Sequence, residues 1–377
     1  MAKRKELRQA YGFDDVAIAP GTVTVNPGMT DVSTQIGDLT LDVPILASAM
    51  DAVVDPAFAI ELGRRGGLAV LNLEGLQCRF DDPDSILAEV AGSDTEGATQ
   101  ILQKAYTNPI RPELVGQRIQ EIKDGGVPAA VSVTPPNAKK LAPIVDEAGA
   151  DFFVVAATVT TARHVSSSKT GLILSELIDQ MSMPVLVGNT VSYDATLELM
   201  REGIAGLLVG VGPGAACTSR EVLGIGVPQV TATIDCAAAR DTYFEESGRY
   251  VPIITDGGIR TGGDLCKSFA SGADAVMIGS PFAGTLEAPG RGYHWGMATP
   301  HAELPRGVRV HVGQHTSLEK LLFGPTSRTN GTENLVGALR TCMGSVGAEK
   351  LRDMHDADVI IAPAIKTEGK IYQMMRD

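Results

Sequence analysis

The sequence predicts an α/β protein in which eight parallel strands close into a single (β/α)8 TIM barrel. Eight short apolar runs follow one another along the chain, and segments with helical spacing separate most of them. Most of the 42 glycines lie at the ends of apolar runs, where strands would turn into helices. A doubly wound open sheet is the alternative. Eight regular units favour closure, and no Gly-x-Gly-x-x-Gly fingerprint stands where a dinucleotide-binding sheet would need it.

The predicted strands are the apolar runs themselves. They span 44–48, 68–72, 127–133, 151–157, 184–189, 206–209, 252–256 and 275–279. The predicted helices span 55–66, 113–124, 136–147, 171–181, 192–202, 227–246, 263–271 and, closing the ring, 334–351. The first helix begins at Asp55-Pro56, because Asp is a good N-cap and Pro is favoured at the first helical position.

Three segments depart from the repeat, and we expect all of them to belong to one catalytic domain, residues 1–377. Residues 1–40 have no helical period and predict an N-terminal arm. Residues 74–112 are polar and acidic, and predict a linker-like excursion with some helix, too short for a second domain. Residues 287–310 follow the eighth strand and are rich in Gly, Pro and His, which predicts an active-site flap. The tail from residue 358 is expected to be extended.

The composition narrows the classes of partner. A formal net charge of −13 disfavours nonspecific binding to nucleic acid or to anionic membranes, but backbone N–H groups at helix N-termini can still hold a phosphorylated ligand. The five cysteines include no Cys-x-x-Cys pair and no metal spacing with His, which is typical of reduced thiols in a cytoplasmic protein. We find no secretory signal and no apolar run of membrane-spanning length, so we expect no membrane partner.

A glycine-rich loop follows the strand at 206–209 and presents one cysteine. Gly210, Gly212 and Gly214 permit positive φ values and let the backbone approach a ligand or ion closely. A thiol at the tip of such a loop, Cys217, can be reached by a substrate. The alternative is a tight turn that happens to contain a buried cysteine.

In a parallel barrel, ligands bind at the carboxyl ends of the strands. Asp256-Gly257-Gly258 and Gly279-Ser280 end consecutive strands there and precede helices, which predicts a phosphate site built from backbone N–H groups. Either glycine turn alone could instead reflect tight turn geometry. We expect the Asp256 carboxylate to accept hydrogen bonds from sugar hydroxyls; its alternative role is to cap the next helix. Other polar or sulfur-bearing residues at strand ends are Ser48, Met50 and Asn189.

Taken together, these motifs resemble one known family. The segments Gly212-Pro-Gly-Ala-Ala-Cys217-Thr-Ser-Arg220 and Gly224-Ile-Gly-Val-Pro-Gln-Val-Thr-Ala232 resemble the active-site loop of IMP dehydrogenases and the related GMP reductases. The nucleotide-site motifs of the same superfamily are matched by Ser48-Ala-Met-Asp51, Ile254-Thr-Asp-Gly-Gly-Ile-Arg260 and Val276-Met-Ile-Gly-Ser280. The resemblance extends from about residue 13 to the C-terminus. Because the tandem CBS regulatory module has no counterpart, the chain resembles the short GuaB-related branch of IMP dehydrogenases.

The resemblance implies an oxidation of IMP to XMP with NAD as cofactor. The Cys217 thiolate would attack C2 of IMP, hydride would pass to NAD, and water would hydrolyse the thioimidate. The implied K⁺ ligands are carbonyl oxygens of Gly212, Gly214 and Cys217, joined by Glu368 and Gly369 of a neighbouring subunit in a homo-oligomer, a tetramer or octamer. The implied substrate residues are Ser48, Met50, Ala215, Asp256, Gly257, Gly258, Met277, Gly279, Ser280, His294, Gly296 and Met297. The implied cofactor residues are Ala156, Thr158, Asn189, Gly210 and Gly212.

Four substitutions set this chain apart from the family pattern. Ala156 stands where an Asp usually binds the NAD ribose, and Ala215 replaces a phosphate-site Ser. His294 stands where the family has Tyr before Gly-Met, and Ser219 replaces a Thr while keeping its hydroxyl.

The predicted flap also departs from the family. The stretch between Met297 and Pro305 is much shorter than the family's mobile flap and has no Arg-Tyr pair to activate water. His301 and Arg306 are the candidate substitutes as base or electrostatic helper. The alternatives are a solvated loop histidine and an arginine that pairs with acids of the tail.

Two other functions remain open from the sequence. A GMP reductase-like enzyme would use NADPH to deaminate GMP to IMP. This chemistry requires a Glu shortly after the Gly-Met segment, and Glu303 is the only Glu there, at an unsuitable spacing. A purine-nucleotide sensor would keep the barrel and the phosphate site without catalysis. The presence of Cys217 argues against a sensor, because a binding protein needs no thiol there.

Overall fold

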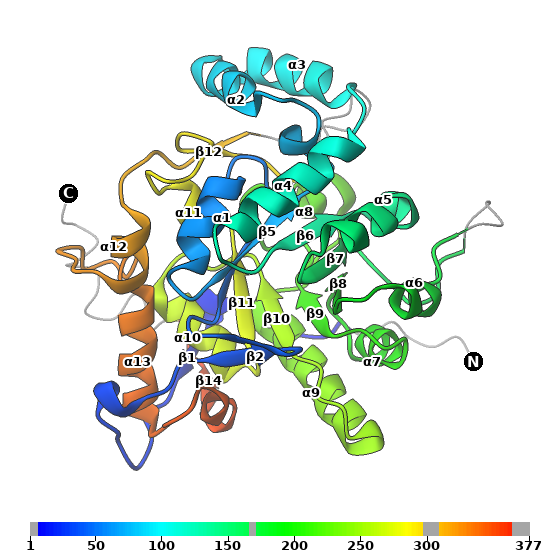
Figure 1. Ribbon diagram of the computed structural model, residues 1–377. Coiled ribbons are helices and arrows are strands. Elements are labelled where there is room, and N and C mark those ends of the chain that lie inside the picture. Colours follow the sequence, from blue (N-terminus) through cyan, green and yellow to red (C-terminus); the bar gives the residue numbers. More distant parts are fainter. Residues whose placement is uncertain (1–6, 166–170, 297–308, 364–377) are drawn as a thin grey trace.

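The computed structural model describes residues 7–165, 171–296 and 309–363 and shows a closed barrel (Figure 1). Eight parallel strands run around it in the order β4-β5-β6-β7-β8-β9-β10-β11, and β11 pairs with β4 to close the ring. The (β/α)8 prediction is therefore confirmed, and the open-sheet alternative is wrong. The strands are β4 (Ile45–Ala47), β5 (Leu68–Asn72), β6 (Ala130–Val133), β7 (Phe152–Ala156), β8 (Val185–Thr190), β9 (Gly206–Val209), β10 (Ile253–Asp256) and β11 (Ala275–Ile278).

Helices surround the barrel near the predicted positions. Asp55 caps the first helix as expected, its side chain accepting a 2.7 Å hydrogen bond from the Phe58 backbone N–H. The last helix ends at Val346 rather than at residue 351, because Gly347 adopts a left-handed conformation with φ +82°. The helices observed at the predicted positions are α1 (Pro56–Gly63), α4 (Pro112–Asp124), α5 (Pro135–Ala148), α6 (Leu174–Gln180), α7 (Tyr193–Arg201), α9 (Gln229–Ser247), α10 (Gly262–Ala270) and α13 (Leu335–Val346).

The amino end of the barrel is plugged, which leaves the carboxyl end to hold a site. The hairpin of β2 (Thr34–Ile36) and β3 (Leu39–Leu41) places Ile36 and Leu41 in the same apolar cluster as the barrel interior. Interior and exterior side chains alternate along each strand, as period-two geometry requires. Phe152 and Val154, for example, belong to the interior cluster, whereas Phe153 packs among the surrounding helices.

Part of the N-terminal arm pairs with part of the C-terminal tail. Within the arm, β1 (Val16–Ile18) pairs antiparallel with β14 (Val359–Ile361), so this part of the tail is extended as expected. Just before β1, a short 3₁₀ turn, Phe13–Asp15, lies at the carboxyl end of the barrel. The arm therefore contributes to the mouth of the barrel instead of trailing from it.

Segment 74–112 is more ordered than a linker. It forms a helical hairpin, α2 (Pro83–Gly92) and α3 (Thr95–Tyr106), which projects from the barrel at the top of Figure 1. Leu87, Val90 and Leu102 pack with Trp295 in a small apolar cluster of their own. The hairpin therefore packs against Trp295 in the first part of the predicted flap.

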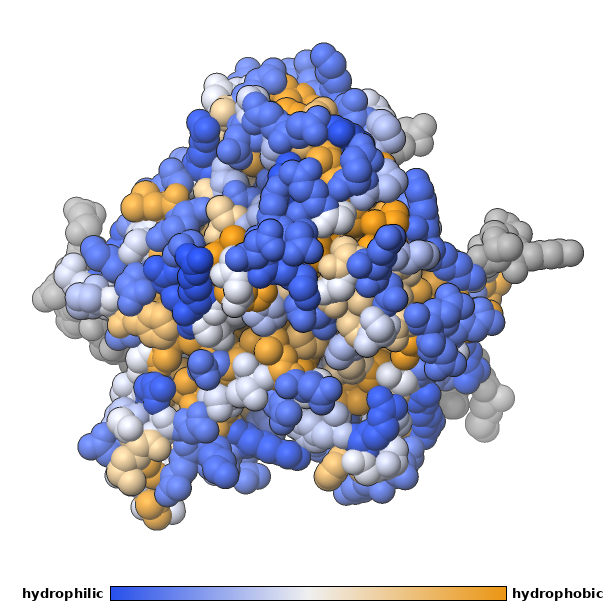
Figure 2. All heavy atoms as spheres, viewed as in Figure 1, coloured by the Kyte–Doolittle hydropathy of each residue, from blue (hydrophilic) through white to orange (hydrophobic). Residues whose placement is uncertain are grey.

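The remaining elements are short. Four-residue α11 (Ser280–Ala283) follows β11, and α8 (Ser219–Leu223) follows the cysteine loop. In the 287–310 segment, β12 (Tyr293–His294) pairs with β13 (Val310–His311), and α12 (Leu318–Phe323) comes after it. Hydrophilic side chains predominate on the face shown in Figure 2. Among the described residues, no helix has the length and apolar character needed to span a membrane.

Candidate active site

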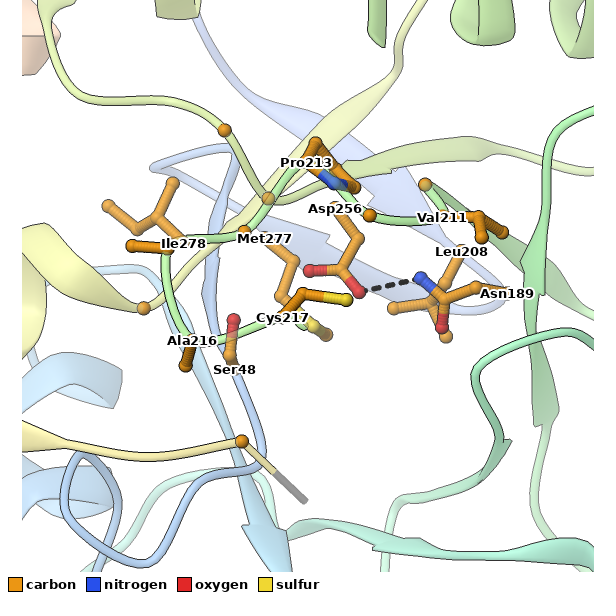
Figure 3. Close-up of a pocket in the computed structure, with 18 of the residues that line it drawn as sticks. Ser48, Asn189, Leu208, Val211, Pro213, Ala216, Cys217, Asp256, Met277 and Ile278 are labelled. Atoms are coloured by element: carbon orange, nitrogen blue, oxygen red, sulfur yellow. Dashed lines mark hydrogen bonds between the residues drawn. The ribbon is translucent and has the colours of Figure 1, made fainter. Parts of the chain in front are cut away.

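A cavity of about 1000 Å³ opens at the carboxyl end of the barrel (Figure 3). Its volume lies at the upper end for small-molecule sites, so it has room for two ligands side by side. Every described residue that the sequence assigned to substrate, cofactor or ion lines this cavity. They are Ser48, Met50, Ala156, Thr158, Asn189, Gly210, Gly212, Gly214, Ala215, Cys217, Asp256, Gly257, Gly258, Met277, Gly279, Ser280, His294 and Gly296.

Glycine is required where the cysteine loop leaves β9. Gly210 and Gly212 have φ values of +154° and +86°, which L-residues rarely adopt. A Cβ on Gly210 would lie 2.2 Å from the Asp256 carbonyl oxygen. The loop therefore passes directly against the end of β10, and this contact places the cysteine beside Asp256.

Cys217 faces the cavity. Its backbone N–H donates to the Gly214 carbonyl at 3.0 Å, which turns the loop, and its side chain is half-buried. Figure 3 shows the thiol in the same hollow as Ser48, Asp256 and Asn189. The alternative of a cysteine buried in a tight turn is therefore wrong.

Ser219 does not line the cavity, but its side chain is bonded to Cys217, which does. Its side chain is fully buried at the start of α8, and its Oγ accepts a 3.3 Å hydrogen bond from Cys217 Sγ. It is the one described residue assigned to catalysis that does not line the cavity. Its hydroxyl orients the thiol from behind.

Asp256 and Asn189 form the polar pair of the site. Asn189 Nδ2 donates to Asp256 Oδ2 at 2.7 Å, and the pair is drawn in Figure 3. Burial raises the pKa of Asp256 to about 6, although the Asn189 hydrogen bond opposes the shift. The capping alternative for Asp256 is wrong, because Thr261 caps α10. Among the described residues no donor is bonded to Oδ1, which leaves it to accept a ligand hydroxyl.

The glycine turns after β10 and β11 are shaped by close contacts. Gly257 and Gly258 have φ values of +88° and +80°. A Cβ on Gly279 would lie 2.9 Å from the Met50 sulfur, so this turn brings the backbone against the loop after β4. The Gly257 N–H already donates to the Met277 carbonyl at 3.1 Å, which makes it a poor donor to an anion.

His294 lies beside these turns. Its Nε2 is 3.0 Å from Ser280 Oγ, and the side chain is 1 % exposed. Burial lowers the pKa of His294 to about 4, so the ring is neutral near pH 7 and offers hydrogen bonds without a charge. Its buried Nδ1 has no partner within the part of the chain that the structure describes.

Five assigned residues lie outside the described residues. They are Met297, His301, Arg306, Glu368 and Gly369.

The cavity also contains residues to which the sequence analysis gave no role. Gln229 Nε2 donates hydrogen bonds to the carbonyl oxygens of Val209 at 2.6 Å and Asp256 at 3.2 Å, and so links the ends of β9 and β10. Glu74, Ser132 and Thr134 form the wall at the ends of β5 and β6. A sequence signal existed for Glu74, because it comes two residues after a predicted strand, where barrel enzymes place ligand-binding residues.

Fold and site together define the class: a (β/α)8 barrel that presents a thiol, a carboxylate and glycine turns to one cavity at its carboxyl end. The sequence model of the IMP dehydrogenase / GMP reductase domain matches residues 10–370. This chain therefore belongs to the IMP dehydrogenase/GMP reductase family.

Individual relatives agree with this placement. An uncharacterized oxidoreductase of Mycolicibacterium smegmatis is 40% identical over 366 residues, covering 95% of this chain and 98% of the relative. An inosine-5′-monophosphate dehydrogenase of Cryptosporidium parvum is 29% identical, covering 93% and 91%. The crystal structure of an IMP dehydrogenase/GMP reductase-like protein from Corynebacterium glutamicum superposes with a TM-score of 0.90 at 37% identity, covering 96% of this chain and 97% of that one.

Proposed function

We propose that this protein oxidises IMP to XMP with NAD, through a covalent intermediate on Cys217. The observation that carries the proposal is the placement of a half-buried thiol in the same cavity as the Asp256 carboxylate and the glycine turns after β10 and β11. The thiol is the nucleophile, the carboxylate recognises a sugar, and the turns receive a phosphate. The family membership and the dehydrogenase name of the Cryptosporidium parvum relative support this assignment.

The residues suggest how IMP would lie. Asp256 Oδ1 accepts from the ribose hydroxyls, and Asn189 holds the carboxylate in place through Oδ2. The phosphate lies toward Gly258 and Ser280, which puts the base over Cys217. The Cys217 sulfur, as thiolate, forms a bond to C2 of the base, and the hydride from C2 is accepted by NAD. Hydrolysis of the C–S bond by water then releases XMP and restores the thiol.

The co-substrate and the ion belong to the same proposal. Thr158, Asn189 and Ala156 line the side of the cavity next to Cys217 and would receive the nicotinamide. Main-chain carbonyls of the cysteine loop are suitable oxygen ligands for K⁺, although the Gly214 carbonyl already accepts the Cys217 N–H. The loop would keep its shape when such an ion binds, since glycine φ values already set its turns. A homo-oligomer would supply the further K⁺ ligands.

One assay separates the candidate functions. Purified protein with IMP, NAD and K⁺ should raise absorbance at the NADH wavelength, and GMP with NADPH should leave absorbance unchanged. NADPH oxidation with GMP would instead favour the reductase, and tight nucleotide binding without turnover of either pair would favour a sensor.

The Cys217→Ser variant should abolish turnover while largely sparing IMP binding. The matched control is Cys342→Ser, which changes another half-buried thiol, in α13 and outside the cavity. Normal rates in Cys217→Ser would refute the covalent mechanism.

A further inference from the structure

The cavity extends past Cys217 to a sector formed by β5, β6 and β7. In the barrel register, Asn72 pairs with Ser132 and Ser132 with Val154, so the strand ends of this sector are adjacent. Val133 pairs with Val155, which places the next residues, Thr134 and Ala156, side by side about 5 Å apart. The side chain of Ala156 is a methyl group and cannot form a hydrogen bond with a ligand at this strand end.

The carboxylate of Glu74, which follows β5, lies at the end of the neighbouring strand β6. Glu74 Oε1 accepts from the Thr134 backbone N–H at 2.5 Å and from Thr134 Oγ1 at 2.6 Å. These two bonds fix the carboxylate at the end of β6, next to Ala156. Among the described residues no donor is bonded to Glu74 Oε2, and Glu74 lines the cavity.

A second observation points independently to a ligand here. Ser132 lines the same wall, its side chain is 1 % exposed, and its Oγ has no hydrogen-bond partner within the described chain. Buried hydroxyls are nearly always bonded, and leaving one unpaired is costly. A polar ligand group in this sector would satisfy it.

We propose that Glu74 and Ser132 bind the ribose diol on the nicotinamide half of the hydride-accepting dinucleotide. This inference rests on the proposed dehydrogenase function. A carboxylate oxygen with no bonded donor accepts hydrogen bonds from two vicinal hydroxyls well, and the sector lies beside Ala156, on the side of the cavity that would receive the nicotinamide.

The test is direct binding of NAD, measured by calorimetry on IMP-saturated protein in the Cys217→Ser background, which prevents turnover. Glu74→Gln keeps an oxygen for the two Thr134 bonds and removes the charge. We expect the NAD Kd to rise about tenfold or more and IMP affinity to change less than about twofold. The matched control is Glu147→Gln, which removes an exposed charge from α5 outside the cavity.

A second variant separates binding from structure. Ser132→Ala removes a hydroxyl that is unbonded within the described ligand-free chain, so thermal stability should hold or rise while the NAD Kd increases several-fold. If Glu74→Gln fails to fold, Ser132→Ala decides the proposal alone. Unchanged NAD affinity in the folded variants overturns the proposal. Absence of any NAD binding and of IMP oxidation in the wild type would instead overturn the proposed function.

Discussion

Replacing Asp256 by Asn should stabilise the ligand-free protein at alkaline pH. Burial raises the pKa of Asp256 from 3.8 to about 6, so the folded protein disfavours the ionised form. Between these two values the folded state holds a proton that the unfolded chain has released, and the free energy of unfolding therefore falls as pH rises. A shift of about two units, at 1.36 kcal/mol each, amounts to about 3 kcal/mol at most.

Asparagine removes this cost because it does not ionise, and its oxygen can still accept the Asn189 hydrogen bond. The unfolding free energy of the variant should therefore exceed that of the wild type by up to about 3 kcal/mol at pH 8. At pH 5 the difference should be about half of that, because most of the folded wild type is protonated there while the unfolded chain is ionised. Urea unfolding at the two pH values measures the difference.

The control is Asp42→Asn, which makes the same change at an exposed position and should show no such pH dependence. The variant should also bind IMP at least tenfold more weakly, because the carboxylate that accepts from the ribose is gone. A stability gain of equal size at pH 5 and pH 8, or a loss at pH 8, would refute the link between burial, ionisation and stability.

Two further substitutions test a contact outside the cavity and a turn that lines it. Tyr106→Phe removes the hydroxyl that accepts from Trp295 Nε1 at 3.1 Å and donates to the buried Asp51 carboxylate. We expect the free energy of unfolding to fall by about 1–3 kcal/mol, measured by urea unfolding with the fluorescence of Trp295, the single tryptophan. Unchanged stability and emission would contradict the contact. Gly258→Ala places a methyl group at a φ of +80°, and we expect IMP affinity to fall far more than inosine affinity. An equal loss for both ligands would contradict a phosphate role for this turn.

Much of the fold could be predicted because its signals are local. Apolar strand segments, helix caps such as Asp55 and turn glycines such as Gly347 act within a few residues. Once a parallel barrel is predicted, Cys217 and Asp256 are expected in one cavity, because both follow the carboxyl ends of strands. The predicted end of the last helix, residue 351, is wrong, because the left-handed Gly347 ends α13 at Val346.

The contacts that the sequence did not indicate are long-range. The acidic pattern of 74–112 hid the apolar face that α2 and α3 turn toward Trp295, far along the chain. Glu74 follows a predicted strand, but its place in the cavity wall depends on the pairing of β5 with β6, which lets Thr134 donate to its carboxylate. Neither contact has a periodicity that a single sequence reveals.

The measurement that bears most directly on the central claim is mass spectrometry of protein quenched in acid during reaction with IMP and NAD. The thiol loses a proton and IMP loses a hydride, so the peptide that contains Cys217 should gain the mass of IMP less two hydrogens. Formation of NADH without any adduct on that peptide would contradict nucleophilic catalysis by Cys217.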